Sequence, residues 1–200
     1  MKDNILFISY YTDGYYKEVI NKYLVPSLQK FDINWFVGMK PNLHDWLKNG
    51  KYKTQFILDM LLFSNKDIVW LDADAELLQF PKLFYDISTD IDIGVHYLDW
   101  YKFWHNTENK LKFELLTGTI FFRNNEKTIS LVKEWNELNQ SSLEWAQKIL
   151  PKLLDKRKEL NVYKLPIEYC QIIKINKVIP KNTVIAQLQV SRETKHNSKI

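Results

Sequence analysis

Apolar residues recur along the chain with two different spacings, and each spacing predicts one kind of element. Short runs rich in strand formers predict strands at Ile5–Ser9, Ile33–Val37, Asp67–Leu71, Ile93–His96 and Thr119–Phe122. Helical spacing predicts helices at Tyr16–Leu28, Gln55–Phe63, Lys127–Leu138 and Leu143–Leu160. Pro151 should end or kink the last of these helices. Because strands and helices alternate, the sequence predicts an α/β fold with a mostly parallel central sheet flanked by helices.

Length and composition favour one domain that spans residues 1–200. A chain of 200 residues with 46% hydrophobic content can bury a sizeable core. The apolar runs Phe56–Phe63 and Leu115–Phe122 are both shorter than the roughly 18 residues that span a bilayer. The N-terminus lacks the pattern of a secretory signal, and a single cysteine, Cys170, fits a reducing compartment. We therefore expect a soluble, cytoplasmic protein without a transmembrane segment.

Charge and aromatic content narrow the class of partner. The net charge of +4, from 28 basic and 24 acidic residues spread along the chain, is too mild to indicate a nucleic-acid partner. A basic surplus could aid an anionic substrate, or weakly favour an anionic membrane surface. Aromatic residues make up 14% of the chain and cluster at 10–16 and 100–104. Such rings either pack in the core or stack on sugars and bases.

Two aspartates directly follow the apolar run Ile68–Leu71, at the strand end where open parallel sheets place their ligands. Asp72 and Asp74 are two residues apart, so on an extended chain their carboxylates project to one side while Ala73 points away. Oxygen ligands of this kind suit Mg²⁺ or Mn²⁺, and such ions are usually shared with substrate phosphates. The motif predicts a divalent metal held against a nucleotide diphosphate. The alternative is a simple turn or helix cap.

At several segments the chain resembles the GT-A-fold nucleotide-diphospho-sugar transferases, a family with a Rossmann-like sheet and a DxD motif. The segments are 11–15, 46–56, 69–81, 117–123 and 165–170. The similarity extends over nearly the whole chain, and the segment with Asp72 and Asp74 is the most specific. The resemblance implies a glycosyltransferase that moves a sugar from a nucleotide diphosphate, by default UDP, to a hydroxyl acceptor such as a glycan.

The resemblance also implies roles for single residues. Those expected to bind the donor nucleotide sugar and its metal are Tyr11, Thr12, Tyr15, Lys53, Asp72, Ala73 and Asp74. Lys53 would neutralise phosphate charge, although a solvated lysine at a helix start is an equal alternative. Thr117 and Gly118 would lie beside the acceptor, where a glycine lets the backbone approach closely.

The third metal ligand departs from the family pattern. Relatives often place a histidine shortly before a Ser-Arg pair near the C-terminus, whereas the segment 184–192 contains glutamines. A glutamine carbonyl can still bind a hard cation, so Gln187 is the expected third ligand. His196 in the tail is the alternative.

The expected chemistry needs a metal and, in one case, a base. A metal held by Asp72 and Asp74 would stabilise the charge on the departing phosphate. If the reaction inverts configuration, a carboxylate must act as base. The family has an acidic residue near the helix predicted at Leu143–Leu160, which points to Glu144, and Asp99 is a second candidate. If it retains configuration, the leaving phosphate could take the proton.

Two other functions stay open. Haloacid-dehalogenase-like phosphatases also place a D-x-D after an apolar strand and use the first aspartate as nucleophile, but normally on the first strand of the fold. A non-catalytic module that binds sugar nucleotides or glycans would explain the missing histidine and the aromatic surplus. A trapped phosphoenzyme would identify the phosphatase, and binding without transfer would identify the module.

The segment Trp100–Phe113 is long for a connection between two predicted strands. It combines aromatic residues with polar ones, a mixture that suits stacking on a sugar while its hydroxyls are hydrogen-bonded. We predict an acceptor-side loop that becomes ordered with donor and metal, in which Trp100 and Trp104 bind the substrate. Packing of these rings in the core is the alternative.

Overall fold

A six-stranded sheet with the order β2-β1-β3-β6-β5-β7 forms the centre of the computed structural model, which describes residues 4–100, 113–173 and 178–190. The strands are β1 (Ile5–Thr12), β2 (Trp35–Lys40), β3 (Asp67–Leu71), β5 (Ile93–Asp99), β6 (Phe113–Phe122) and β7 (Val162–Lys164). β6 runs antiparallel to β3 and β5, and the other strands share one direction. The predicted mostly parallel sheet is therefore confirmed.

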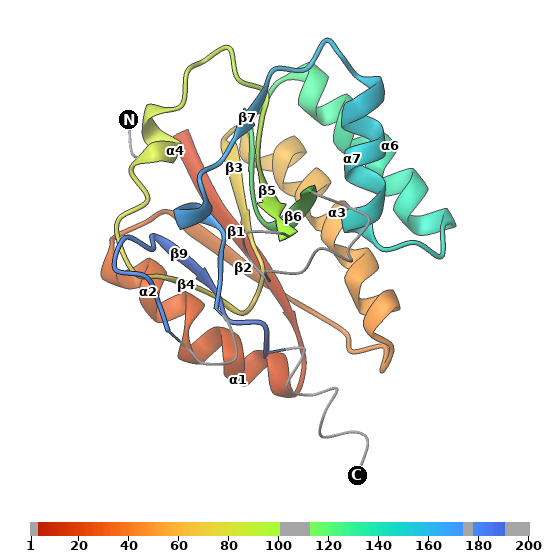
Figure 1. Cartoon of the computed structure of the whole chain (residues 1–200). Helices are drawn as coiled ribbons and strands as arrows, with labels where there is room; N and C mark the ends of the chain where they lie inside the picture. Colours follow the sequence, from red (N-terminus) through yellow and green to blue (C-terminus); the bar gives the residue numbers. More distant parts are fainter. Residues whose placement is uncertain (1–3, 101–112, 174–177, 191–200) are drawn as a thin grey trace.

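Helices cover both faces of this sheet (Figure 1). One face carries α3 (Trp46–Ser64), α6 (Glu126–Ser141) and α7 (Ala146–Lys156). The other carries α1 (Tyr15–Lys22), α2 (Leu24–Lys30) and the short α4 (Leu83–Asp86). In the described part of the chain, none of the helices is both long enough and apolar enough to cross a membrane.

The core has two halves because neighbouring residues of a strand point to opposite faces of the sheet. Within β3, Ile68 and Trp70 pack under α3, α6 and α7, whereas Val69 and Leu71 pack under α1, α2 and α4. All residues of β3 are buried, as expected for a strand covered on both faces. This central strand fixes the position of the residues that follow it.

A second, three-stranded sheet lies beyond the end of β3. It consists of β4 (Ala75–Leu77), β8 (Gln171–Ile172) and β9 (Ile185–Gln187) in the order β4-β9-β8, and the 3-10 helix Ile167–Tyr169 precedes β8. β9 runs antiparallel to β4, with Gln187 opposite Ala75. This pairing brings residues 188–190 back to the two aspartates.

Three predicted helices differ from the observed ones. The helix predicted at Tyr16–Leu28 is broken at Tyr23, because Pro26 cannot bond backward and fits only the first turn of a new helix, α2. α3 begins nine residues before the predicted Gln55, with Asp45 as its N-cap. Pro151 does not end α7, since the buried face around it holds the helix together to Lys156.

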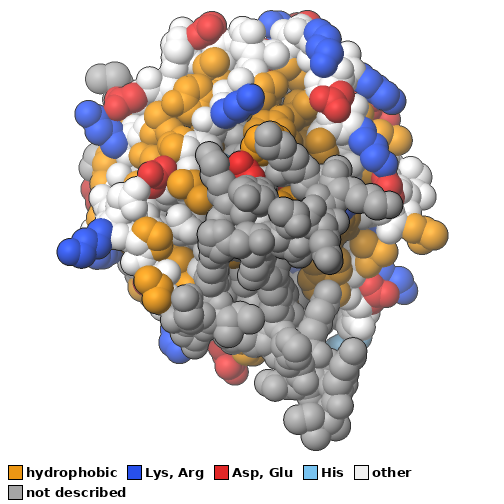
Figure 2. Space-filling model, in the orientation of Figure 1, with side chains coloured by type: hydrophobic (Ala, Val, Ile, Leu, Met, Phe, Trp, Pro, Cys, Tyr) orange, Lys and Arg blue, Asp and Glu red, His pale blue; other side chains and the backbone are white. Residues whose placement is uncertain are grey.

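Charged side chains are dispersed on the face shown in Figure 2. There, Lys and Arg lie around the rim of the molecule, interspersed with Asp and Glu. This distribution agrees with the even spread of lysines along the sequence.

Candidate active site

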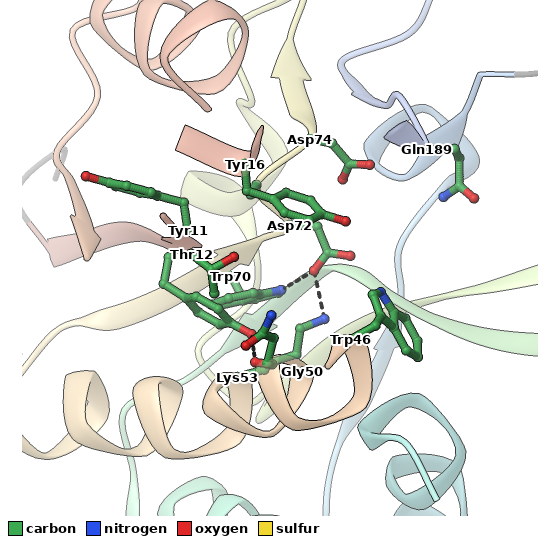
Figure 3. A pocket seen from close by; sticks show the side chains of 13 residues that line it. Tyr11, Thr12, Tyr16, Trp46, Gly50, Lys53, Trp70, Asp72, Asp74 and Gln189 are labelled. Carbon is green, nitrogen blue, oxygen red and sulfur yellow. Dashed lines mark hydrogen bonds and ion pairs between the residues drawn. The ribbon is translucent and has the colours of Figure 1, made fainter. Parts of the chain in front are cut away.

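The C-terminal ends of β1 and β3 lie side by side and open into a cavity of about 200 Å³, called here the aspartate cavity. Asp72, Ala73 and Asp74 line it, as do residues from the end of β1 and from the first turns of α3 (Figure 3). The strands are adjacent and parallel, so their polar ends meet at one edge of the sheet, where α/β folds commonly bind ligands.

Asp72 is held in place through one of its two carboxylate oxygens. Its Oδ1 accepts a hydrogen bond from the Trp70 indole (2.9 Å) and forms an ion pair with the Lys53 ammonium (2.7 Å). Both dashed lines at Asp72 in Figure 3 end on this oxygen. Its backbone N–H also donates to the Gly118 carbonyl on β6 (2.9 Å). The carboxylate therefore has a fixed orientation, and among the described residues none donates a hydrogen bond to Oδ2.

Asp74 is positioned by the segment that follows β9. The Val190 N–H donates to its Oδ2 (3.0 Å), and the Leu188 N–H donates to its backbone carbonyl (3.0 Å). Burial, and then the negative charge of Asp72, raise the pKa of Asp74 to about 6, against the lowering effect of the Val190 hydrogen bond. A cation bound nearby would favour the charged form of this carboxyl group, because it would offset both the burial and the negative charge of Asp72.

The two aspartates line one cavity because the chain turns between them, not because it is extended. Residues 72–74 form a turn between β3 and β4, in which the Ala75 N–H donates to the Asp72 carbonyl (2.9 Å). The alternation expected of a strand does not apply in a turn, and Ala73 also lines the cavity instead of pointing away from it. The turn achieves the predicted convergence by folding back on itself.

One face of α3 forms a second wall of the aspartate cavity. Trp46, Asn49, Gly50 and Lys53 lie at helical spacing and all line it. The Lys53 ammonium also donates to the Thr117 carbonyl (3.0 Å), and its side chain is only 12% exposed. Lys53 is therefore inside the site and is not a solvated lysine at a helix start.

The end of β1 contributes aromatic and hydroxyl side chains. Tyr11 and Thr12, which are expected to bind the donor, line the aspartate cavity together with Tyr16 from α1. Tyr15 does not line it and is 42% exposed, with its ring against that of Tyr16 (6.0 Å between centroids). In the first turn of α1, neighbouring residues point in different directions, so Tyr16 takes the place expected for Tyr15.

The two glutamines near the C-terminus have different environments. Gln187, the predicted metal ligand, is buried, and its amide donates to the Thr119 hydroxyl (2.9 Å). Gln189 instead lines the aspartate cavity, from a left-handed backbone conformation (φ 59°). Gln187 points inward because it belongs to β9, whereas Gln189 lies beyond the end of that strand. His196 lies outside the described residues.

The residues expected near the acceptor are only partly brought together. Thr117 lines a neighbouring cavity, described below, and Gly118 packs against the side chain of Gln187. Trp100 lines neither cavity, and its indole donates to Glu114 (2.9 Å). Trp104 and the rest of the loop 101–112 lie outside the described residues.

Glu144, the expected base, also lines neither cavity. It is half-exposed and forms an ion pair with Lys152 (2.6 Å). Sequence reasoning missed Tyr10, Tyr16, Trp46 and Gln189 in the aspartate cavity. For Trp46 a signal exists, because positions 46, 49, 50 and 53 follow helical spacing once Asp45 is read as an N-cap.

The carboxylates present fit a divalent cation that is shared with phosphate oxygens. Asp72 and Asp74 supply hard oxygen ligands in one cavity, which suits Mg²⁺ or Mn²⁺. Among residues 4–100, 113–173 and 178–190, His, Cys, Asp and Glu form no group of three that could hold a metal ion. An ion at this place would thus need further ligands from substrate or water.

Comparisons with known proteins identify the family of the chain. The family model of the nucleotide-diphospho-sugar transferases matches residues 41–200. The fold is similar to that of a glycosyltransferase involved in the glycosylation of the major capsid of PBCV-1, with a TM-score of 0.68 and 11% sequence identity, over 98% of this chain and 99% of that chain. No curated protein matches the sequence. The chain belongs to the nucleotide-diphospho-sugar transferase family and is a glycosyltransferase.

Proposed function

We propose that this enzyme is metal-dependent and transfers a sugar from a nucleotide diphosphate, with UDP as the nucleotide that the family resemblance implies, to a hydroxyl acceptor such as a glycan. The observation that carries the proposal is the meeting of Asp72, Asp74 and Lys53 in one cavity at the edge of the sheet. Two carboxylates for a cation and one ammonium for phosphate are the charges that a diphosphate requires.

The aspartate cavity offers separate surfaces to the parts of the donor. Tyr11, Thr12 and Tyr16 supply ring faces and hydroxyls suited to a base and a ribose, and the Asp72 carboxylate lies against Lys53 of α3. The diphosphate would then lie beside Asp72 and Asp74, with Mn²⁺ or Mg²⁺ between them. When bound, such a metal stabilises the negative charge on the departing phosphate.

The chain's own residues prepare this site before the donor arrives. Hydrogen bonds from Trp70 and Val190 fix the orientation of the Asp72 and Asp74 carboxylates, so both are preorganised before the donor binds. Lys53 compensates the charge of Asp72 in the free protein. Because its ammonium lies between Asp72 and Thr117, we propose that it also binds a phosphate oxygen as charge develops there.

The carboxylates of the two cavities in the described residues are Asp72 and Asp74 alone. Glu144 is therefore not proposed as the base. Asp72 and Asp74 are proposed to hold the metal that stabilises the leaving group, and Gln189, which lines the cavity, is proposed as its neutral ligand in place of Gln187.

A screen of nucleotide sugars tests the function. The purified protein is incubated with each nucleotide sugar and Mn²⁺, and released nucleotide diphosphate is measured with and without EDTA. Metal-dependent release from at least one donor is expected. Binding of a nucleotide sugar without any release or transfer would instead identify a binding module, and a trapped phosphoenzyme would identify a phosphatase.

A further inference from the structure

A second cavity, of about 120 Å³, adjoins the aspartate cavity and is called here the tryptophan cavity. Four residues line both cavities: Trp46, Gly50, Lys53 and Asp72. The two cavities therefore share a wall that contains two charged groups of the proposed reaction, Lys53 and Asp72. The tryptophan cavity is the smaller of the two and lies on the α7 side of this wall, away from β1.

Two exposed tryptophans meet at the tryptophan cavity. Trp46 begins α3 and Trp145 is the N-cap of α7, and their ring centroids are 5.1 Å apart with the planes tilted by 59°. Both residues are nonetheless exposed, Trp46 by 46% and Trp145 by 38%. An exposed indole beside polar groups is the surface that carbohydrate ligands use, since the C–H face of a sugar packs on the ring.

Polar groups lie within reach of a ligand on these rings. The side-chain oxygen of Gln147, Oε1, accepts hydrogen bonds from the Thr117 backbone N–H and from the Thr117 hydroxyl, both at 3.3 Å. These distances are long for hydrogen bonds, so a ligand hydroxyl could replace either contact at little cost. The Gln147 amide nitrogen donates to Glu114 (2.9 Å), which fixes the orientation of the side chain. The polar groups are thus positioned but not saturated.

The charge of the lining indicates an uncharged ligand. The described charged residues of the tryptophan cavity are Lys53 and Asp72, which form an ion pair with each other. The described lining therefore contains no unpaired cation that would favour an acidic or a phosphorylated sugar. A neutral sugar ring instead matches both the indole faces and the amide and hydroxyl groups.

We propose that the tryptophan cavity is the acceptor subsite, and that it binds a neutral sugar ring with Trp145 as the platform and Gln147 as the hydroxyl partner. This assignment rests on the proposed glycosyltransferase function. It deepens that function by naming the acceptor class and its residues. A ring on Trp145 would present a hydroxyl toward Lys53 and Asp72, which line both cavities and beside which the reacting end of the donor would lie.

Binding of simple sugars tests this assignment without a known acceptor. The probes are methyl glycosides of glucose, galactose, mannose and N-acetylglucosamine, and saturation-transfer NMR is recorded with UDP and the diamagnetic ion Mg²⁺ present. At least one glycoside should bind to the parent protein. Trp145→Ala should weaken that binding about tenfold or more, and Trp145→Phe should retain most of it.

Two controls separate the possible failures. Phe63→Ala removes a ring on α3 that is 80% exposed and lines neither cavity, so glycoside binding should stay within about twofold of the parent. UDP affinity of each variant is measured by calorimetry in the same buffer. The assignment is overturned if UDP binds but no glycoside does, or if Trp145→Ala binds the glycoside as the parent does. Glycoside binding that depends on Trp145, with no UDP binding, would support the sugar subsite but overturn the proposed donor function.

Discussion

The aspartate cavity and the tryptophan cavity share a wall, but they are built from different parts of the fold. The aspartate cavity is framed by the ends of two adjacent parallel strands. Each of its carboxylates is held by hydrogen bonds, that of Asp72 from the Trp70 indole and that of Asp74 from the Val190 backbone N–H. The tryptophan cavity is formed largely by the starts of two helices, whose tryptophans Trp46 and Trp145 remain exposed. A rigid frame suits the donor chemistry, because small displacements of metal ligands are costly. Exposed side chains at helix starts can change with the acceptor while the core stays the same.

The largest effect is expected at Lys53, which belongs to both cavities. Lys53→Ala removes the ammonium that contacts Asp72 and Thr117 and should lower the rate of nucleotide release about 100-fold, as for other groups that stabilise developing charge. Lys51→Ala is the matched control, since Lys51 is on the same helix and bonds to the Gln140 carbonyl instead. Equal rates for the two variants would mean that the shared wall has no part in the reaction.

The next effect concerns stability at the close contact behind the shared wall. A methyl group added at Gly118 would lie 2.8 Å from the Gln187 side chain, so Gly118→Ala should lower the free energy of unfolding by about 1–3 kcal/mol. Gly50→Ala, which meets no atom within 4 Å and lies inside α3, should instead raise it by roughly 0.5–1 kcal/mol. Urea denaturation measures both. A stable Gly118→Ala protein would show that Gln187 is free to move.

A smaller effect distinguishes the two glutamines. Gln189→Ala should weaken the Mn²⁺-dependent part of UDP binding by roughly tenfold, because Gln189 lines the aspartate cavity. Gln187→Ala should leave that affinity unchanged and lower the free energy of unfolding by about 1 kcal/mol, because it removes the buried bond to Thr119. The reverse pattern would restore Gln187 as the metal ligand.

The last effect is a pH dependence of the metal-free protein. The pKa of Asp74 is raised from 3.8 to about 6, so the folded state binds this proton more tightly than the unfolded state does. The resulting stabilisation is fully present below pH 3.8 and is lost as the pH rises through 6. Asp74→Asn should remove this loss. Urea denaturation in EDTA across that range measures it, and identical slopes for parent and variant would contradict the burial of the Asp74 carboxyl.

The sequence predicts the sheet and the residues of the aspartate cavity better than the residues of the tryptophan cavity. β3 and its two aspartates are evident because an apolar strand followed by charged residues is a local pattern. The start of α3 was missed because Asn49-Gly50 resembles a turn, although Asp45 supplies a cap. Trp145 and Gln147 meet Thr117 only through the packing of α7 on β6, which no local pattern encodes. The sequence does not show which glutamine lines the aspartate cavity, because the end of β9 decides that Gln187 points inward and Gln189 lies beside the cavity.

Calorimetric titration with UDP tests the central claim, that Asp72 and Asp74 hold a metal against a nucleotide diphosphate. The parent protein, Asp72→Asn and Asp74→Asn are titrated in Mn²⁺ and again in EDTA. The asparagine variants keep the shape of the side chain but remove its charge. We predict that EDTA weakens UDP binding by the parent about tenfold or more, and that each variant in Mn²⁺ behaves as the parent does in EDTA. Equal UDP affinity with and without metal, or an unchanged affinity in Asp74→Asn, would contradict the metal bridge.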